Sequence, residues 1–265
     1  MKKLLFTLAV CACGASAYAQ QYVISGTKSE KTEGMKPAMT ELYYPKVERI
    51  VPGDAATASA PSDAIVLFDG KDLSKWINSN GKEALWKING DGTMTVNKDM
   101  KNGGGSIQTK DSFRDYQLHI EWCAPANITG SGQARGNSGV YMQGMYEIQI
   151  LDNYENETYV NGQAGSLYKQ SAPLVNPCRK PGEWNVYDII YKAPTFNDNG
   201  TYRTFPLVTV IFNGVVVQNN TQLIGTTEYI GLPTVKPHGD GPILLQCHGD
   251  PSEPISFRNI WIRKL

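Results

Sequence analysis

The feature that most limits the fold of this chain is a series of short apolar runs separated by Gly, Asn, Asp and Pro. Such runs fill the sequence from Ile65 onward and include YQLHIEWCA, MYEIQILD and GPILLQCHGD. Short runs bounded by turn residues are typical of strands. The segment IFNGVVV places Asn213 and Gly214 between two apolar arms, which predicts a tight hairpin with a type I′ turn.

Helical periodicity and internal repeats are both missing from this pattern. No amphipathic stripe of useful length is visible, and no repeat of roughly 20–50 residues marks a propeller or a solenoid. The 26 Gly, 15 Pro and 14 Tyr agree with an all-β chain. We therefore predict an all-β domain that folds as a two-sheet sandwich or jelly roll.

The N-terminus has the features of an export signal. MKKLLFTLAVCACGASAYAQ contains two lysines, a short apolar stretch and an Ala17-Tyr18-Ala19 site, so we predict a signal peptide over 1–19 that is cleaved after Ala19. The alternative, a lipoprotein acylated on Cys13, agrees less well with VCAC. We interpret residues 20–62 as an extended arm and linker and residues 63–265 as the domain. A periplasmic or secreted location follows from this interpretation.

Charge excludes several partners. The 25 basic and 25 acidic residues balance, so the basic excess of a nucleic-acid-binding protein is missing. After the signal peptide, no run reaches the roughly 20 apolar residues that span a bilayer. We expect neither nucleic-acid binding nor a membrane span, and at most a lipid tether at Cys13.

Strand alternation sorts the polar residues onto faces. In MYEIQILD, Glu147 and Gln149 share the face opposite Tyr146, Ile148 and Ile150, and Asp152 has the opposite parity to Glu147. The same rule groups two further sets, which are Gln246, His248 and Asp250, and His119, Glu121 and Cys123. A solvated sheet face is one explanation. His, Glu, Gln and Asp are also the types that hold sugars and move protons, which favours a ligand groove if these strands share one curved sheet.

Two loops add candidates for ligand binding. GQARGNSGV over 132–140 carries Arg135 and Asn137. The long loop 162–185 carries Tyr168 and Lys169, which could reach the groove, and Trp184, for which core packing is the stronger interpretation than sugar stacking. We also expect Tyr141 on the neighbouring strand to bind the ligand. His248, Asp250 and Glu147 could ligate a divalent cation, although a single histidine is weak support.

Several blocks together resemble a known family. LFDGKDLSKW (67–76), GNSGVYMQGMYEIQILD (136–152), KPGEWN (180–185), the NG hairpin and GPILLQCHGDPSEPISFRNIWIRKL (241–265) occur in order. They resemble the bacterial 3-keto-disaccharide hydrolase domain, and the chain looks like a secreted Bacteroidetes member. The resemblance implies a concanavalin-like jelly roll with a concave carbohydrate groove. It also implies cleavage of glycosides oxidised to a ketone at C3.

The resemblance also implies a set of site residues. It assigns Glu147, Gln149, His248 and Asp250 to the groove and Arg135 and Asn137 to the adjoining loop. Cys247 replaces the usual Asp of LQDHGD, and alternation directs it to the core. We predict His248, Glu147 and Asp250 as catalytic residues. The predicted substrate-binding residues are Arg135, Asn137, Gln149, Glu121, Tyr141, Lys169 and Gln246.

The chemistry has three possible classes. EIQILD is similar to the motif of laminarinase-like β-glucanases, but Gln149 and Asp152 alter two of its three key positions, and a retaining glycosidase needs two close carboxyls. A 3-keto substrate allows proton abstraction at C2, elimination of the C1 leaving group and addition of water. A groove that binds glycans without chemistry is the third class. We expect the elimination, with His248 as base, oriented by Asp250, and Glu147 as acid or metal ligand.

Overall fold

The computed structural model describes Lys46 and residues 59–265. These residues form strands and three 3₁₀ turns, with no α-helix among them. The predicted signal peptide, Cys13 and most of the predicted arm lie outside the described residues. No helix in the described part of the chain is long and apolar enough to cross a membrane.

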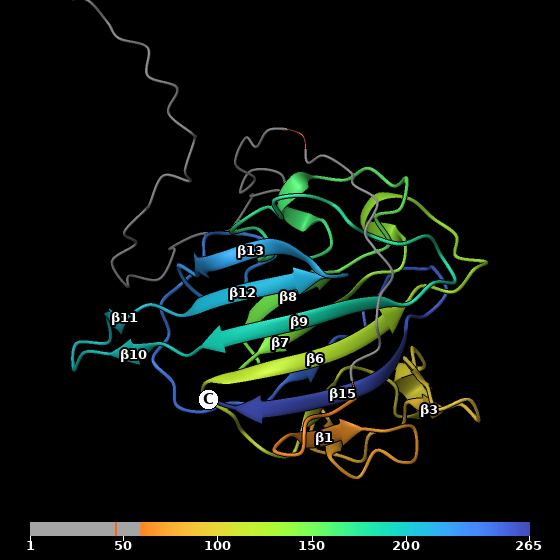
Figure 1. The fold of residues 1–265 in the computed structure, drawn as a ribbon, viewed down its shortest axis with the longest axis horizontal. Helices are drawn as coiled ribbons and strands as arrows, with labels where there is room; N and C mark the ends of the chain where they lie inside the picture. The colour runs from red at the N-terminus through yellow and green to blue at the C-terminus, as the bar shows by residue number, and fades with distance from the viewer. Residues whose placement is uncertain (1–45, 47–58) are drawn as a thin grey trace, which may run out of the picture.

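The strands form two antiparallel sheets that face each other, so the fold is the predicted all-β sandwich. The eight-stranded sheet has the order β13 (Val215–Gln222), β12 (Leu207–Phe212), β9 (Asn185–Lys192), β6 (Tyr116–Cys123), β15 (Ser256–Lys264), β4 (Met94–Thr95) and β3 (Lys87–Ile88), with β1 (Ile65–Phe68) paired to β15. The five-stranded sheet has the order β2 (Trp76–Asn78), β5 (Ile107–Thr109), β14 (Leu244–Leu245), β7 (Ser138–Met142) and β8 (Tyr146–Ile150). Figure 1 shows β13, β12, β9, β6 and β15 side by side, with β7 and β8 behind them.

Short elements complete the structure. A separate hairpin pairs β10 (Thr195–Phe196) with β11 (Tyr202–Thr204). The 3₁₀ turns are η2 (Met100–Asn102), η3 (Gly132–Ala134) and η4 (Val160–Gly162). The predicted NG hairpin connects β12 to β13, and its φ angles of 52° at Asn213 and 80° at Gly214 are those of a type I′ turn.

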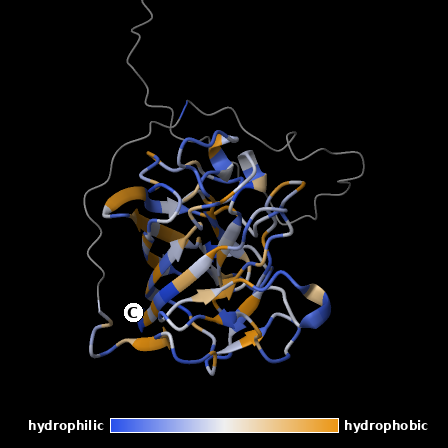
Figure 2. Cartoon of the chain, turned by 90° about the vertical axis from the view of Figure 1, so that its right-hand side faces the viewer, coloured by the Kyte–Doolittle hydropathy of each residue, from blue (hydrophilic) through white to orange (hydrophobic). Residues whose placement is uncertain are grey.

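The core lies between the two sheets and is built by the alternation read from the sequence. Tyr146, Ile148 and Ile150 of β8 are fully buried. The ring of Tyr146 lies 6.3 Å from that of Tyr191 on β9, and the Tyr187 hydroxyl donates to the Gln149 carbonyl at 2.7 Å. Figure 2 shows hydrophobic and hydrophilic residues alternating along the strands. The side chains of Glu147 and Gln149 therefore point away from the eight-stranded sheet.

One expectation about strand order is wrong. The polar face of β6 was expected to join the groove, but β6 belongs to the eight-stranded sheet, whereas β7, β8 and β14 belong to the five-stranded sheet. Leu118, Ile120 and Trp122 face the core with 0% exposure. His119 and Glu121 consequently lie on the opposite side of the sandwich from Glu147.

Candidate active site

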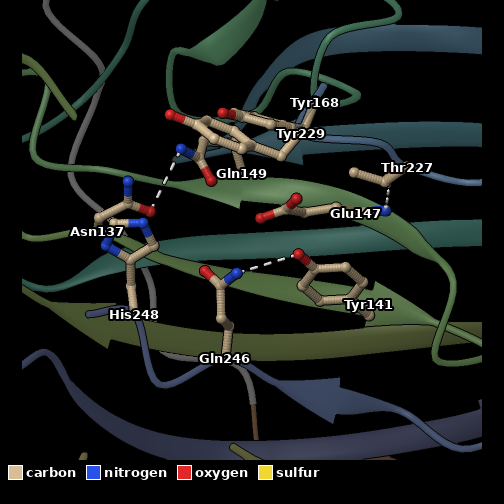
Figure 3. Close-up of a pocket in the computed structure, with 9 residues that line it drawn as sticks. All are labelled: Asn137, Tyr141, Glu147, Gln149, Tyr168, Thr227, Tyr229, Gln246 and His248. Carbon is tan, nitrogen blue, oxygen red and sulfur yellow. Dashed lines mark hydrogen bonds between the residues drawn. The ribbon is translucent and has the colours of Figure 1, made fainter. Parts of the chain in front are cut away.

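A pocket opens on the outer face of the five-stranded sheet (Figure 3). Its volume is about 150 Å³. The strands β7, β8 and β14 and the loops beside them supply its lining, which consists of Asn137, Tyr141, Glu147, Gln149, Tyr168, Thr227, Tyr229, Gln246 and His248. The structure therefore brings together six of the residues predicted to act on or bind the ligand: Asn137, Tyr141, Glu147, Gln149, Gln246 and His248.

Glu147 lies at the floor of this pocket and is only 3% exposed. Burial raises its pKa to about 8, although a hydrogen bond with Tyr141 opposes the shift. The carboxyl packs directly on Gly139 of β7, where an added Cβ would lie 2.4 Å from Glu147 Oε1. Gly139 thus provides the space for the carboxyl. At neutral pH the group is mainly a neutral acid that can donate a proton.

Amide side chains lie beside this acid. The Gln149 amide lies between Glu147 and a pair formed by Gln133 and Asn137. With its nitrogen turned toward the floor, Gln149 donates to Glu147 Oε1 at 3.2 Å and to the Ser138 carbonyl at 2.9 Å. The sequence did not single out Gln133, which holds Asn137 in place through two hydrogen bonds from Asn137 Nδ2. These amides can donate to and accept from sugar oxygens.

Gln246 and Tyr141 form a second polar pair. Gln246 Nε2 donates to the Tyr141 hydroxyl at 3.1 Å. Burial and the neighbouring Glu147 carboxyl raise the pKa of Tyr141, so the phenol stays protonated. Gln246 Oε1 is buried without a hydrogen-bond partner among the described residues. A buried acceptor without a partner is costly, and a ligand hydroxyl would satisfy it.

His248 is held by an acidic partner. Its Nδ1 lies 3.0 Å from Asp250 Oδ2, and its side chain is 36% exposed. Burial raises the pKa of Asp250, but hydrogen bonds from His248 and Ser252 and the charge of Lys98 outweigh it and keep the pKa at about 2. The ionised Asp250 therefore fixes the orientation of the imidazole and leaves Nε2 for other contacts. Asp250 itself does not line the pocket.

Aromatic and hydroxyl side chains from two loops complete the lining. Tyr168 is 8% exposed and Tyr229 is 61% exposed, so they lie at different depths of the same pocket. Thr227 Oγ1 accepts a hydrogen bond from the Glu147 backbone at 2.9 Å. Tyr168 was a candidate in the sequence, but Thr227 and Tyr229 lie in a segment without strand periodicity and carried no signal.

Two predicted loop residues lie outside the lining. Arg135 Nε donates to Asp152 Oδ2 at 2.7 Å, and Asp152 is 1% exposed. The opposite parity of Asp152 is consistent with this position. Lys169 is buried with its Nζ 4.8 Å from the centre of the Tyr159 ring. Arg135 and Lys169 thus each contact a side chain that is itself outside the pocket lining.

Glu121 is the predicted binding residue that the structure separates from the pocket. It pairs with Arg258 Nε at 2.6 Å and Asn259 Nδ2 at 2.7 Å on the other sheet. Trp184 is not a pocket residue either, since its ring stacks on the Arg258 guanidinium at 4.1 Å. Strand order is a long-range property, which explains the error over Glu121.

The predicted cation ligands do not form a cluster. No group of three or more His, Cys, Asp or Glu side chains among the described residues is arranged to hold a metal ion. Asp250 already accepts from Lys98, Ser252 and His248. Cys123, Cys178 and Cys247 form no disulfide bond with one another. Cys247 packs partly against the core, as its parity indicates.

The sandwich with a polar pocket on one sheet face has the architecture of a glycosyl hydrolase/lyase-like β-sandwich domain, the class to which its relatives belong. Residues 63–263 match the model of the 3-keto-alpha-glucoside-1,2-lyase-like domain, and the chain belongs to this family. The resemblance seen in the sequence is therefore confirmed. None of the curated proteins matches this chain.

Solved structures agree with this assignment. A Parabacteroides distasonis protein described as a "putative glycosyl hydrolase" shares 62% identity and a TM-score of 0.77, over 88% of this chain and 98% of its own. A second such protein from the same organism has 25% identity and a TM-score of 0.50, over 76% and 99% of the two chains. A third, at 20% identity and a TM-score of 0.53 over 77% and 94%, shows the fold alone.

Proposed function

We propose that this protein cleaves 3-keto-glycosides by elimination across C1 and C2, followed by addition of water. The observation that carries the proposal is one neutral carboxyl, Glu147, at the floor of a sugar-sized pocket whose other side holds an oriented histidine. Glu147 on β8 and His248, which follows β14, line the same pocket from opposite sides of β7.

The reaction begins at the carbon next to the ketone. His248 Nε2 removes the C2 proton, and the electrons of the C2–H bond move toward the C3 oxygen as an enolate. The Glu147 proton stabilises that oxygen because it is a preorganised donor in a buried site, and the Gln149 amide holds the carboxyl in place. When the enolate collapses, the C1–O bond breaks, a C1–C2 double bond forms and the C3 ketone is restored.

Hydration then completes the cycle. Water adds its oxygen to C1, and C2 regains a proton from His248, so a 3-keto sugar and a free aglycone result. Gln246 Oε1 and Asn137 Oδ1 are suited to accept hydrogen bonds from the remaining hydroxyls. The laminarinase-like alternative needs a second carboxyl near Glu147, but Asp152 is 1% exposed, bound to Arg135 and outside the pocket lining.

The test compares a 3-keto-glucoside with its unoxidised parent. We expect aglycone release from the keto compound alone, and a drop on the order of 10²–10⁴-fold in His248→Asn, the range for loss of a general base. Faster release from the unoxidised parent would restore the glucanase alternative. Binding of both compounds without release would favour a lectin-like module.

The place of action is part of the proposal. The predicted signal peptide supports export to the periplasm or beyond, with a lipid tether at Cys13 as the alternative. Fractionation of cells that produce the full chain tests this, together with mass analysis of the mature N-terminus. A chain that begins at Gln20 agrees with cleavage after Ala19.

A further inference from the structure

The elimination leaves one proton unassigned. The oxygen that departs from C1 needs a proton, and Glu147 and His248 are engaged with the C3 oxygen and the C2 proton. The pocket of about 150 Å³ is smaller than the roughly 300–1,000 Å³ of sites that enclose a drug-sized ligand. It has room for about one sugar ring, so in the proposed reaction the aglycone extends toward the mouth and the C1 oxygen lies between floor and mouth.

Tyr168 lies at that depth, with 8% exposure compared with 3% for Glu147 and 61% for Tyr229. Its backbone N–H donates to the Glu147 carbonyl at 3.1 Å. Because β8 is the edge strand of its sheet, Tyr168 lies on the side of β8 that faces away from β7. His248 lies on the other side of Glu147, past β7 and β14. Figure 3 shows the Tyr168 ring on one side of Glu147 and His248 on the other.

The Tyr168 hydroxyl has a partner suited to loss of a proton. It lies 2.5 Å from the Tyr159 hydroxyl. The two hydroxyls are therefore within direct hydrogen-bond reach of each other. If Tyr168 donates its proton, Tyr159 can donate to the resulting phenolate and stabilise it.

A cation supports the same pair. Lys169 Nζ lies 4.8 Å from the centre of the Tyr159 ring, within cation–π range. Side chains of adjacent residues in extended backbone point to opposite faces. Lys169 has a φ of 63°, a left-handed conformation that is strained for a residue with a side chain. This backbone conformation allows the adjacent side chains of Tyr168 and Lys169 to contact the same residue, Tyr159. The positive charge of Lys169 beside this pair favours the phenolate form of Tyr168.

We propose that Tyr168 is the acid that protonates the leaving-group oxygen, with Tyr159 and Lys169 as positioning residues. This inference rests on the proposed function of the same pocket. As the C1–O bond breaks, its electron pair goes to the aglycone oxygen, which takes the Tyr168 proton. During hydration the phenolate takes a proton from the attacking water, so the phenol is restored.

The experiment varies the leaving group in the full-length protein. The substrates are 3-keto-glucosides of 4-nitrophenol, which leaves without protonation, and of methanol, which does not. Tyr168→Phe should lose on the order of 10²–10⁴-fold on the methyl substrate, the range for a general acid, and less than about tenfold on the nitrophenyl substrate. Tyr229→Phe, the matched control, should affect both equally. Equal losses in Tyr168→Phe would overturn the inference.

A second readout separates this inference from the proposed function. A 3-keto sugar without a C1 substituent can exchange its C2 proton with D₂O but cannot eliminate. Tyr168→Phe should keep this exchange, and His248→Asn should lose it. Loss of exchange in Tyr168→Phe would make Tyr168 the base and refute its role as acid. A wild-type protein that neither exchanges nor cleaves would refute both proposals.

The positioning residues have their own test. Lys169→Met should shift the ratio of nitrophenyl to methyl activity in the direction of Tyr168→Phe, by a smaller factor, and Lys169→Arg should restore it. A ratio that stays at the wild-type value in Lys169→Met would remove Lys169 from the mechanism.

Discussion

Replacing Glu147 by Gln should make the protein more stable at neutral pH while it impairs the reaction. In the folded protein burial raises the pKa of this carboxyl from its ordinary value of 4.5 to about 8. A raised acid pKa means that the folded state holds the proton more tightly than the unfolded state. The contribution to stability is therefore fully present below pH 4.5 and is lost as the pH rises toward 8.

The size of the effect follows from the two values. Each pH unit between them changes the free energy of unfolding by about 1.4 kcal/mol, so about 4 kcal/mol is lost by pH 7.5. Glu147→Gln removes the ionisation and keeps nearly the same volume. The difference in unfolding free energy between variant and wild type should rise by about 1.4 kcal/mol per pH unit from pH 5 to 7.5.

Urea denaturation of both proteins at pH 5, 6, 7 and 7.5 measures this difference. Asp250 and His119 are present in both proteins, so their own titrations cancel. The wild type should also lose activity above about pH 8, where Glu147 becomes an anion that cannot stabilise an enolate. A stability difference that is the same at pH 5 and pH 7.5 would show that the carboxyl is not held neutral, and the proposed acid would have to be abandoned.

Three further outcomes are expected. Gly139→Ala places a Cβ 2.4 Å from the buried carboxyl, so activity should fall on the order of 10²-fold while Tm moves by a few degrees. The control Gly90→Ala meets no atom within 4 Å and should match the wild type in both measurements. Lys98→Met breaks the ion pair with Asp250, whose side chain is 1% exposed. The variant should lower the free energy of unfolding by roughly 3 kcal/mol in urea denaturation. Burial lowers the pKa of His119, but hydrogen bonds with Asp188 and Glu121 outweigh it and raise the pKa to about 9. The stability that this group contributes is complete below pH 6.5 and is lost as the pH rises through 9. Asp188→Asn should therefore lose less stability than wild type between pH 7 and 9 in urea denaturation.

Local periodicity was enough to predict which side chains share a face. Glu147 and Gln149 line the pocket while Tyr146 and Ile148 pack in the core, because successive side chains on a strand always alternate. The Asn213–Gly214 hairpin is equally local, since two positive φ angles suffice to define it. These features depend only on neighbouring residues.

Sheet order could not be predicted in the same way. The pattern of β6 resembles that of β8, yet Glu121 lies on the other sheet because pairing with β15 and β9 decides its position. Arg135 fits a ligand-binding loop in the sequence, but the buried Asp152 holds it. Tyr229 reaches the pocket from a segment without periodicity, and only the folded chain shows its place.

The position of Glu147 also gives a way to test the proposed enzyme against a module that only binds glycans. A groove that only binds does not need a buried carboxyl whose ionisation burial opposes, since a Gln in the same place would offer one donor group and one acceptor without that cost. The space left by Gly139 and the raised pKa make sense where a proton must be donated to a developing charge. If Glu147→Gln binds 3-keto-glucosides as tightly as wild type but no longer cleaves them, the carboxyl serves the reaction. If the variant loses binding and cleavage in the same proportion, the carboxyl serves recognition, and the donor that stabilises the enolate must come from elsewhere in the pocket.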